Sequence, residues 1–197
     1  MKDFTWEINE NTLEYFDENH EYYVDGVKVP SITEIMTVRF GHKYDIVPEG
    51  TLKRAAEAGT RMHEAIEDYV RNGNDDGSEE VRNFRFLMNR YQITPMRSEV
   101  PVILYQDGPF AAGRLDLELM KDGEIGLGDL KRTSVLDKEY LVYQLNLYKL
   151  AYEQSYHDTV EFLIGLHLRG DKRKLVALPM NYKFADEIIK EWKEKEK

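Results

Sequence analysis

The sequence predicts a single domain of the α/β (α+β) class, in which helices flank a central mixed β-sheet. Its length of 197 residues suits one domain with a substantial core. Its composition, 42% hydrophobic, 12% aromatic and 32% charged, is that of a folded globular protein. Helical and strand periodicities also alternate along the chain, in the order helix, three strands, helix, two strands, helix.

Residues 1–50 predict a β-hairpin followed by a short helix. Aromatic and β-branched runs within residues 15–29 flank Asp25-Gly26, which is a preferred pair for a type I′ turn. Pro30 then ends the extended segment, and Ser31 and Glu34 have the spacing of a capping box. We therefore expect a helix that begins directly after Ser31.

Two amphipathic helices are expected next. Apolar side chains recur every three or four positions between residues 51 and 70, and Gly73 ends this pattern. A polar loop follows, after which Ser78 is placed to cap a second apolar run that stops before Pro95.

The second half of the chain predicts the sheet and its remaining helices. Turn-forming segments at 106–109 and 121–123 separate three short strands, which favours an antiparallel meander. A turn is expected at Gly170-Asp171. The predicted strands are residues 99–105, 113–120, 125–131, 160–169 and 174–180, and the predicted helices are residues 137–156 and 181–197. Residues 51–180 would thus form the core of one domain covering 1–197.

The composition restricts both the kinds of site and the location of the protein. Because the chain has no cysteine, disulfides, thiolate zinc sites and cysteine-ligated iron–sulfur clusters are excluded, leaving His, Asp and Glu as metal ligands. No apolar run approaches the roughly 20 residues that cross a bilayer, and the first residues lack a signal-peptide core. We expect a cytoplasmic protein that does not bind membranes.

The formal net charge of −10 is unevenly distributed. Residues 1–50 carry 4 Lys and Arg against 11 Asp and Glu, so most of the acidity is N-terminal. Basic residues of the remainder gather at Lys53-Arg54 with Arg61, at Arg82–Arg90, at Lys131-Arg132 and at Arg169–Lys174. Each cluster is either a solvated surface or part of a nucleic-acid-binding surface.

Two acidic residues on neighbouring predicted strands form a candidate metal site. Asp129 and Lys131 point to one face of their strand, where a carboxylate can hold a cation while the ammonium neutralises a phosphate. Asp116 lies on the polar face of the preceding strand, and pairing through the turn at 121–123 would bring it close to Asp129. A metal between two carboxylates relieves their repulsion. The alternative is a set of ordinary surface residues.

Two predicted helices carry further candidates. His63 shares one helical face with Gly59 and Glu67. A glycine in mid-helix costs about 1 kcal/mol relative to alanine, which indicates close approach of a ligand or another backbone. Gln144 and Tyr148 stand one turn apart on the helix after Lys131, where they could contact nucleic acid. The alternatives are a satisfied core histidine and a tyrosine at the edge of the core.

These motifs, taken in order, resemble those of the PD-(D/E)XK nuclease superfamily. They are Gly59-x-x-x-His63, Asp116 in a Gly-Arg-x-Asp strand, Asp129-x-Lys131 and Gln144-x-x-x-Tyr148. The branch that looks most similar contains the nuclease domain of RecB and small phage-type exonucleases, and residues 20–33 resemble the leader of the phage-type members. The resemblance covers about residues 50–170 and implies a restriction-endonuclease-like core.

The resemblance also implies an activity and its residues. The chain would be a metal-dependent DNA nuclease, most simply an exonuclease in phage-type recombination, replication or repair. Mg²⁺ or Mn²⁺ would be ligated by His63, Asp116, Asp129 and the backbone carbonyl of Leu130. Lys131 would be the catalytic lysine, and Gln144 and Tyr148 would complete the catalytic site near the DNA. Some relatives bind an iron–sulfur cluster through four cysteines, which this chain lacks.

DNA is the expected partner, and a recombination or single-strand-annealing protein is a further one. Glu67 and Glu99 are candidates for the shell of a second cation, although both could equally be surface residues. Two other functions remain open: a catalytically silent member that binds DNA or a protein partner, and a metallohydrolase acting on small phosphodiesters.

Overall fold

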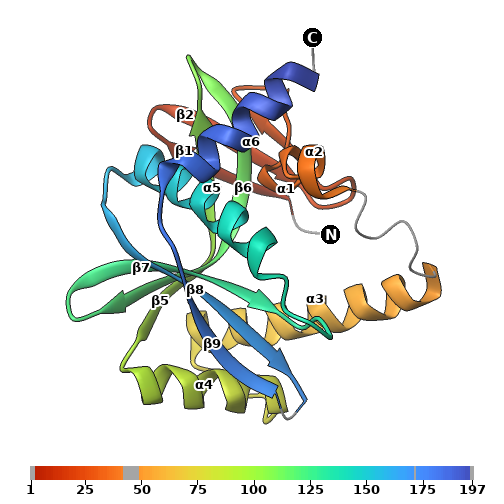
Figure 1. The fold of residues 1–197 in the computed structure, drawn as a ribbon, viewed down its shortest axis with the longest axis vertical. Helices are drawn as coiled ribbons and strands as arrows, with labels where there is room; N and C mark the ends of the chain where they lie inside the picture. The colour runs from red at the N-terminus through yellow and green to blue at the C-terminus, as the bar shows by residue number, and fades with distance from the viewer. Residues whose placement is uncertain (1–2, 42–48, 171, 196–197) are drawn as a thin grey trace.

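Helices flank a mixed five-stranded sheet in the computed structural model, which describes residues 3–41, 49–170 and 172–195 (Figure 1). The predicted α/β (α+β) class is confirmed. The strand order is β5-β6-β7-β8-β9, in which β7 and β8 are parallel and all other neighbours are antiparallel. The strands are β5 (Thr94–Tyr105), β6 (Pro109–Lys121), β7 (Glu124–Lys131), β8 (Val160–Arg169) and β9 (Lys172–Leu178).

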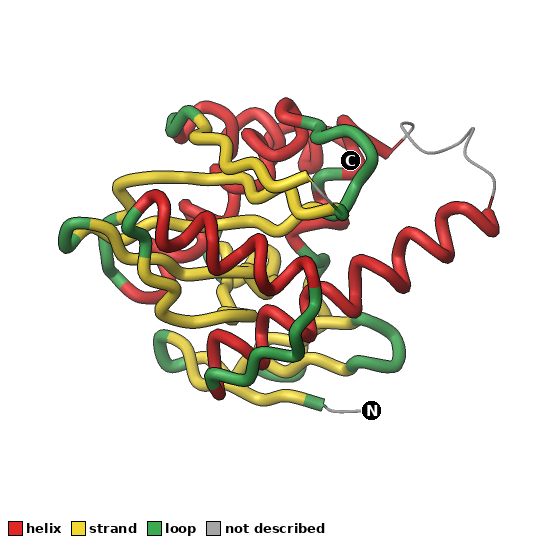
Figure 2. Tube along the Cα trace, turned by 90° about the horizontal axis from the view of Figure 1, so that it is seen from below, coloured by secondary structure: helices red, strands yellow, loops and turns green. Residues whose placement is uncertain are grey.

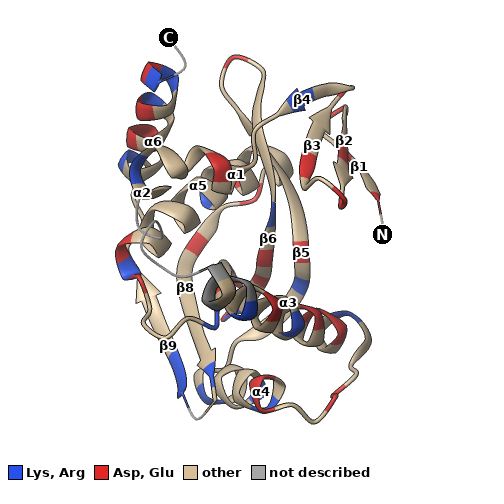
Figure 3. Ribbon diagram, turned by 90° about the vertical axis from the view of Figure 1, so that its right-hand side faces the viewer, with Lys and Arg blue, Asp and Glu red and all other residues tan. Residues whose placement is uncertain are grey.

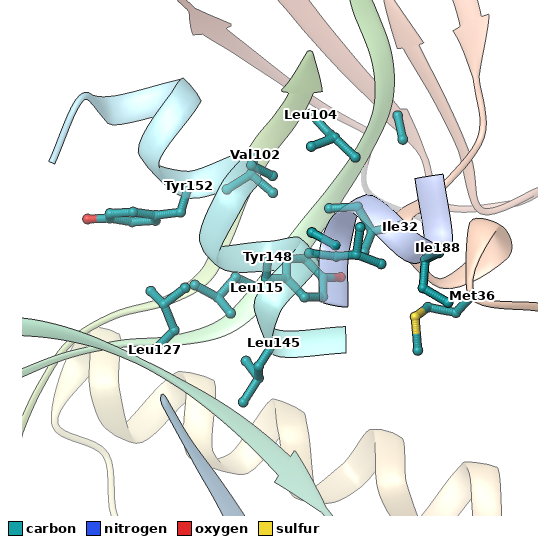
Figure 4. Close-up of a cluster of buried hydrophobic side chains, with 14 of the residues drawn as sticks. Ile32, Met36, Val102, Leu104, Leu115, Leu127, Leu145, Tyr148, Tyr152 and Ile188 are labelled. Atoms are coloured by element: carbon teal, nitrogen blue, oxygen red, sulfur yellow. The ribbon is translucent and has the colours of Figure 1, made fainter. Parts of the chain in front are cut away.

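One face of this sheet is covered by four helices from both ends of the chain. α5 (Lys138–Tyr156) and α6 (Tyr182–Lys195) pack there with the short helices α1 (Ile32–Ile35) and α2 (Thr37–Phe40). The main hydrophobic core lies between these helices and the strands, and Figure 4 shows side chains from both sides meeting in it. α1 has the predicted capping box of Ser31 and Glu34.

The opposite face is covered by α3 (Glu49–Asn72) and α4 (Glu79–Tyr91). Both were predicted, with Ser78 capping α4 and Gly73 in the left-handed conformation after α3. Met62 and Ile66 anchor the middle of α3 in a second core cluster, while its N-terminal end extends beyond the sheets (Figure 2). Only the backbone of Glu49 and of residues 51–53 is described, so the predicted contribution of the Lys53 side chain lies outside the described residues.

The N-terminal segment forms more strands than predicted. The expected hairpin is β3 (Glu21–Val24) and β4 (Val27–Val29), with positive φ at both Asp25 and Gly26. β1 (Phe4–Ile8) and β2 (Asn11–Phe16) extend it to a four-stranded antiparallel sheet. The prediction of a single hairpin was therefore incomplete. A third core cluster joins this sheet to Ile103 and Ala112 of the five-stranded sheet.

Some predicted boundaries also differ from the structure. β5 begins at Thr94 instead of residue 99, with Pro95 at a register shift where its missing N–H is tolerated. β9 lies two residues earlier than predicted, and Asp171 of the predicted turn lies outside the described residues. Within the described part of the chain, no helix is long and apolar enough to cross a membrane.

Candidate metal centre

The candidate site lies where β6 and β7 diverge. The two strands are paired from Lys121 and Glu124 as far as Leu117 and Gly128, and the pairing stops there. Beyond that point the Asp116 carboxylate replaces a backbone partner, because its Oδ2 accepts a hydrogen bond of 2.7 Å from the Leu130 N–H. The Asp116 carboxylate is thereby held in the opening between β6 and β7.

The predicted alternation along β6 does not hold at this point. Leu115 belongs to the main core cluster beside α5, whereas Leu117 and Leu119 belong to the second cluster beside α3 and α4. Asp116 therefore lies at a change of face, and the polar face predicted for its strand does not continue along β6. Glu118 is bonded to Arg97, away from the candidate site.

His63 reaches the same opening from α3. Its Nδ1 lies 3.7 Å from both Asp116 Oδ1 and Glu99 Oε1, and its Nε2 lies 3.3 Å from the Leu130 carbonyl oxygen. One ligand atom each from His63, Glu99 and Asp116 can be chosen so that all lie within 4.8 Å of one another. His63 thus faces the two carboxylates with Nδ1 and the Leu130 carbonyl with Nε2. The structure brings the predicted ligands His63, Asp116 and Leu130 together, and their binding of a metal stays a prediction.

Glu99 lies in the ligand cluster itself, whereas the sequence suggested it for the shell of a second cation. It lies between the register pairs Ser98 with Leu117 and Val100 with Leu115, which puts it opposite Asp116. Its φ of 50° is left-handed, a conformation that costs a non-glycine residue about 1 kcal/mol or more and that gathers at functional sites. Arg114 Nε lies 3.3 Å from Glu99 Oε2 and holds this carboxylate from the side of the N-terminal sheet.

Asp129 and Lys131 form a buried ion pair next to this cluster. Lys131 Nζ lies 2.8 Å from Asp129 Oδ1 and 2.6 Å from Oδ2, and Asp129 is 3% exposed. Burial raises the pKa of Asp129 to about 6, with the Asp116 charge adding to the rise and Lys131 opposing it. Burial would lower the pKa of Lys131, but the charges of Asp129 and Asp116 raise it instead. Lys131 therefore stays an ammonium at neutral pH.

The electrostatics of His63 show that this place favours a cation. Burial alone would lower the pKa of His63, but the charges of Asp116 and Glu99 raise it to about 9. In the metal-free protein the imidazolium therefore supplies the positive charge that the carboxylates require. A nitrogen donor with several carboxylate and carbonyl oxygens suits Mg²⁺ or Mn²⁺, so the residues present fit such an ion.

Gln144 and Tyr148 lie behind the cluster, in the core. They are 5% and 6% exposed, and Tyr148 packs near Ile32 and Leu115 (Figure 4). A Cβ added at Gly113 would lie 3.0 Å from the Tyr148 hydroxyl, so the glycine leaves room for this ring against β6. Burial raises the pKa of Tyr148, and the nearby acidic residues add to the rise. Their predicted contact with DNA stays a prediction.

Two further candidates on α3 lie apart from the ligand cluster. Glu67 pairs with Arg71 at 2.8 Å, which fits the alternative of a surface residue. Among the described residues, a Cβ added at Gly59 would meet no atom within 4 Å, so the predicted close approach of another backbone is not found, and the approach of a ligand stays a prediction.

The basic clusters of the sequence come together in part. Figure 3 shows Lys and Arg on β9, at the end of β8 and on α4, and α4 packs against both strands. Arg173 lies 3.8 Å over the exposed ring of Phe86, which joins β9 to α4. Arg132 pairs with Glu80 of α4 at 2.9 Å, and this contact links the strand end at Lys131 to the same basic surface.

No family model matches the chain, and no curated protein matches it. Among solved structures, the crystal structure of SSO0001 is similar over 82% of this chain and 75% of that one, with a TM-score of 0.46 and 14% sequence identity. Since both values are low, this similarity carries no functional inference, and the function rests on the geometry of the site.

Proposed function

We propose that this chain is a divalent-metal-dependent nuclease that hydrolyses phosphodiester bonds in DNA, most simply from strand ends. One observation carries the proposal: α3, β5 and β6 bring His63, Glu99 and Asp116 within 4.8 Å of one another, beside the buried pair of Asp129 and Lys131 on β7. Ligands for a cation and an ammonium for a phosphate thus meet at one place.

Each residue of the candidate site would have a separate role in the reaction. His63, Glu99, Asp116 and the Leu130 carbonyl would hold the ion, and Asp129 would ligate it from the adjoining strand. Bound Mg²⁺ or Mn²⁺ supplies a Lewis acid that polarises the phosphate and lowers the pKa of a bound water. Lys131 stabilises the negative charge that develops on the phosphate oxygens, and its ion pair with Asp129 orients it for that role.

The distribution of charge supports DNA as the substrate. The acidity lies mostly in residues 1–50, whereas the basic surface on α4 and β9 adjoins the strand end that carries Lys131. We place the DNA path over Lys131-Arg132 toward this surface. A role in phage-type recombination, replication or repair and a single-strand-annealing partner complete the proposal and rest on the sequence resemblance. We also propose a cytoplasmic location, which rests on the hydropathy of the sequence.

Incubation with end-labelled linear DNA and closed circular DNA, single and double stranded, tests the proposal. We expect cleavage with Mg²⁺ or Mn²⁺, none with EDTA, and loss of cleavage in Asp116→Asn but not in the exposed control Asp158→Asn. Binding without cleavage in every metal would favour a silent DNA-binding protein. Hydrolysis of bis(p-nitrophenyl) phosphate but not of DNA would favour a small-molecule metallohydrolase.

A further inference from the structure

A cleft of about 500 Å³ adjoins the metal cluster and shares Glu99 with it. It opens between β1, the C-terminal end of α3 and the first half of β5. Its volume lies in the range of small-molecule sites, roughly 300–1,000 Å³. The lining residues that matter for recognition are Trp6, Arg71, Arg97, Ser98, Glu99 and Tyr156.

Ser98 supplies an unused hydrogen-bonding group in this cleft. The residue is 6% exposed, and its Oγ has no hydrogen-bond partner among the described residues. Buried polar atoms are nearly always hydrogen-bonded, so an unpartnered one that lines a cleft indicates a missing ligand or water. The Ser98 carbonyl is already engaged, because it accepts a 3.3 Å hydrogen bond from Arg71 Nη2.

Two arginines add donors for an anionic group. Arg71 and Arg97 have side chains that are 46% and 45% exposed, although each has a carboxylate partner, Glu67 and Glu118 respectively. An exposed pair such as Arg71 with Glu67 contributes little to stability, so Arg71 can turn to a ligand at small cost. Arg97 is held more firmly, with its guanidinium 4.5 Å over the Tyr156 ring.

The remaining wall is aromatic and apolar. Trp6 is partly exposed and stacks on Phe4, with ring centroids 5.4 Å apart, so the indole is held in place. Met96, which is 48% exposed, also lines the cleft. An ordered aromatic ring beside arginines suits a nucleobase attached to a phosphate, because bases stack on aromatic side chains and phosphates accept from guanidinium groups.

A larger cavity of about 720 Å³ lies elsewhere, at the end of α5, and lacks these features. The Glu153 carboxylate that lines it already accepts hydrogen bonds from Lys149 Nζ and the Tyr182 hydroxyl. It also shares no residue with the metal cluster.

We propose that the cleft beside Glu99 binds one deoxynucleotide, namely the last nucleotide of a DNA strand. This inference rests on the proposed nuclease function. Since Glu99 belongs to both sites, a terminal nucleotide in the cleft places the adjoining phosphodiester at the metal cluster, and cleavage there releases a mononucleotide. The shared chemistry is a nucleobase with a phosphate, whose source is either a strand end or a free mononucleotide.

Fluorescence of Trp6 reports on the cleft directly. The chain has two tryptophans, so Trp192→Phe leaves Trp6 as the one indole. Titration of this variant with dAMP or dTMP in Ca²⁺ should give a saturable change in fluorescence. Arg71→Gln should weaken binding about tenfold, as expected for a lost hydrogen bond to a charged group. The control Lys28→Gln, an exposed basic side chain paired with Glu21 away from the cleft and from the basic surface, should change the affinity less than twofold.

Competition separates the two sources of the ligand. A linear single-stranded oligonucleotide should displace dAMP from the cleft, whereas closed circular single-stranded DNA should not. Equal competition by the two DNAs would overturn the assignment to strand ends. If Arg71→Gln fails the check of folding by circular dichroism, this competition in the Trp192→Phe background decides the question.

The outcomes also separate this inference from the proposed function. No saturable change with dAMP or dTMP, in a protein that cleaves DNA with metal, would refute the nucleotide cleft and leave the nuclease standing. A saturable change that depends on Arg71, in a protein that cleaves no DNA, would support a mononucleotide site and refute the nuclease. Equal losses in Arg71→Gln and Lys28→Gln would also overturn the assignment of the cleft.

Discussion

Replacing Asp129 by Asn should change how the stability of the metal-free protein depends on pH. Burial raises the pKa of Asp129 from its ordinary 3.8 to about 6, so folding favours the protonated form. A pKa raised by about 2 corresponds to about 3 kcal/mol of free energy that favours the protonated over the charged carboxyl in the folded state. Because Asp129 is 3% exposed, solvent screens little of this energy. The protonated Asp129 carboxyl therefore contributes to the free energy of unfolding below about pH 4, and this contribution is lost as pH rises through 6. Asn mimics the protonated carboxyl, so the stability of the variant relative to wild type should rise by up to about 3 kcal/mol between pH 4 and pH 8. Loss of the carboxyl that contacts the buried Lys131 ammonium adds a cost that is the same at both pH values.

Bound metal should favour the wild type over the variant. A cation that binds the folded state alone stabilises it in proportion to the logarithm of its concentration over the dissociation constant. Wild-type protein should gain stability in Mn²⁺, whereas Asp129→Asn, which lacks a charged ligand, should gain less.

Urea unfolding between pH 4 and pH 8, with EDTA or with Mn²⁺, measures both effects. Asp158→Asn, which changes an exposed aspartate, is the matched control and should show no dependence of this kind. If Asp129→Asn is destabilised equally at pH 4 and pH 8, or gains as much from Mn²⁺ as wild type, the reasoning about this buried carboxylate fails.

Further predictions concern the other residues of the cluster. Lys131→Ala should lower the cleavage rate by about 100-fold or more while circular dichroism shows an intact fold, and near wild-type cleavage would remove it from the site. Mn²⁺ binding at pH 7.5 should release a proton, because His63, with a pKa of about 9, must lose it to become a ligand. Calorimetry in buffers of different ionisation enthalpy measures this release, and none is expected in His63→Ala. Glu99→Gln should weaken Mn²⁺ affinity more than Glu67→Gln, and the reverse order would contradict the assignment of Glu99.

The secondary structure was predictable because periodicity and turn residues are local signals. Ser31 and Ser78 cap helices as their neighbours in sequence indicate, and Asp25-Gly26 forms the expected turn. β1 and β2 escaped prediction because their connection, Asn9-Glu10, has positive φ at both positions, and glutamate is not a typical residue there. The alternation of Phe4, Trp6 and Ile8 with polar residues was the remaining signal.

The site was predictable in part, since His63, Asp116, Asp129 and Lys131 follow a recognisable order along the chain. Glu99 could not be assigned to the ligand cluster from the sequence. Its place depends on the register between β5 and β6 and on its own left-handed backbone, and neither follows from local residue patterns.

The helical pattern around Tyr148 left open a contact with nucleic acid or a place at the edge of the core. α5 is buried over most of its circumference, with Leu145, Leu147 and Tyr148 all buried, so a helical stripe there does not separate core from surface. The fold places Gly113 against this tyrosine, a contact that depends on how α5 crosses β6.

The position of a bound manganese ion tests the central claim most directly. Crystals soaked in Mn²⁺ should give an anomalous difference peak between His63, Glu99 and Asp116, on the side of the Leu130 carbonyl, and crystals of His63→Ala should lose or weaken it. A strong manganese peak elsewhere in the molecule with none at this cluster, or an unchanged peak in His63→Ala, would contradict the assignment of the metal centre.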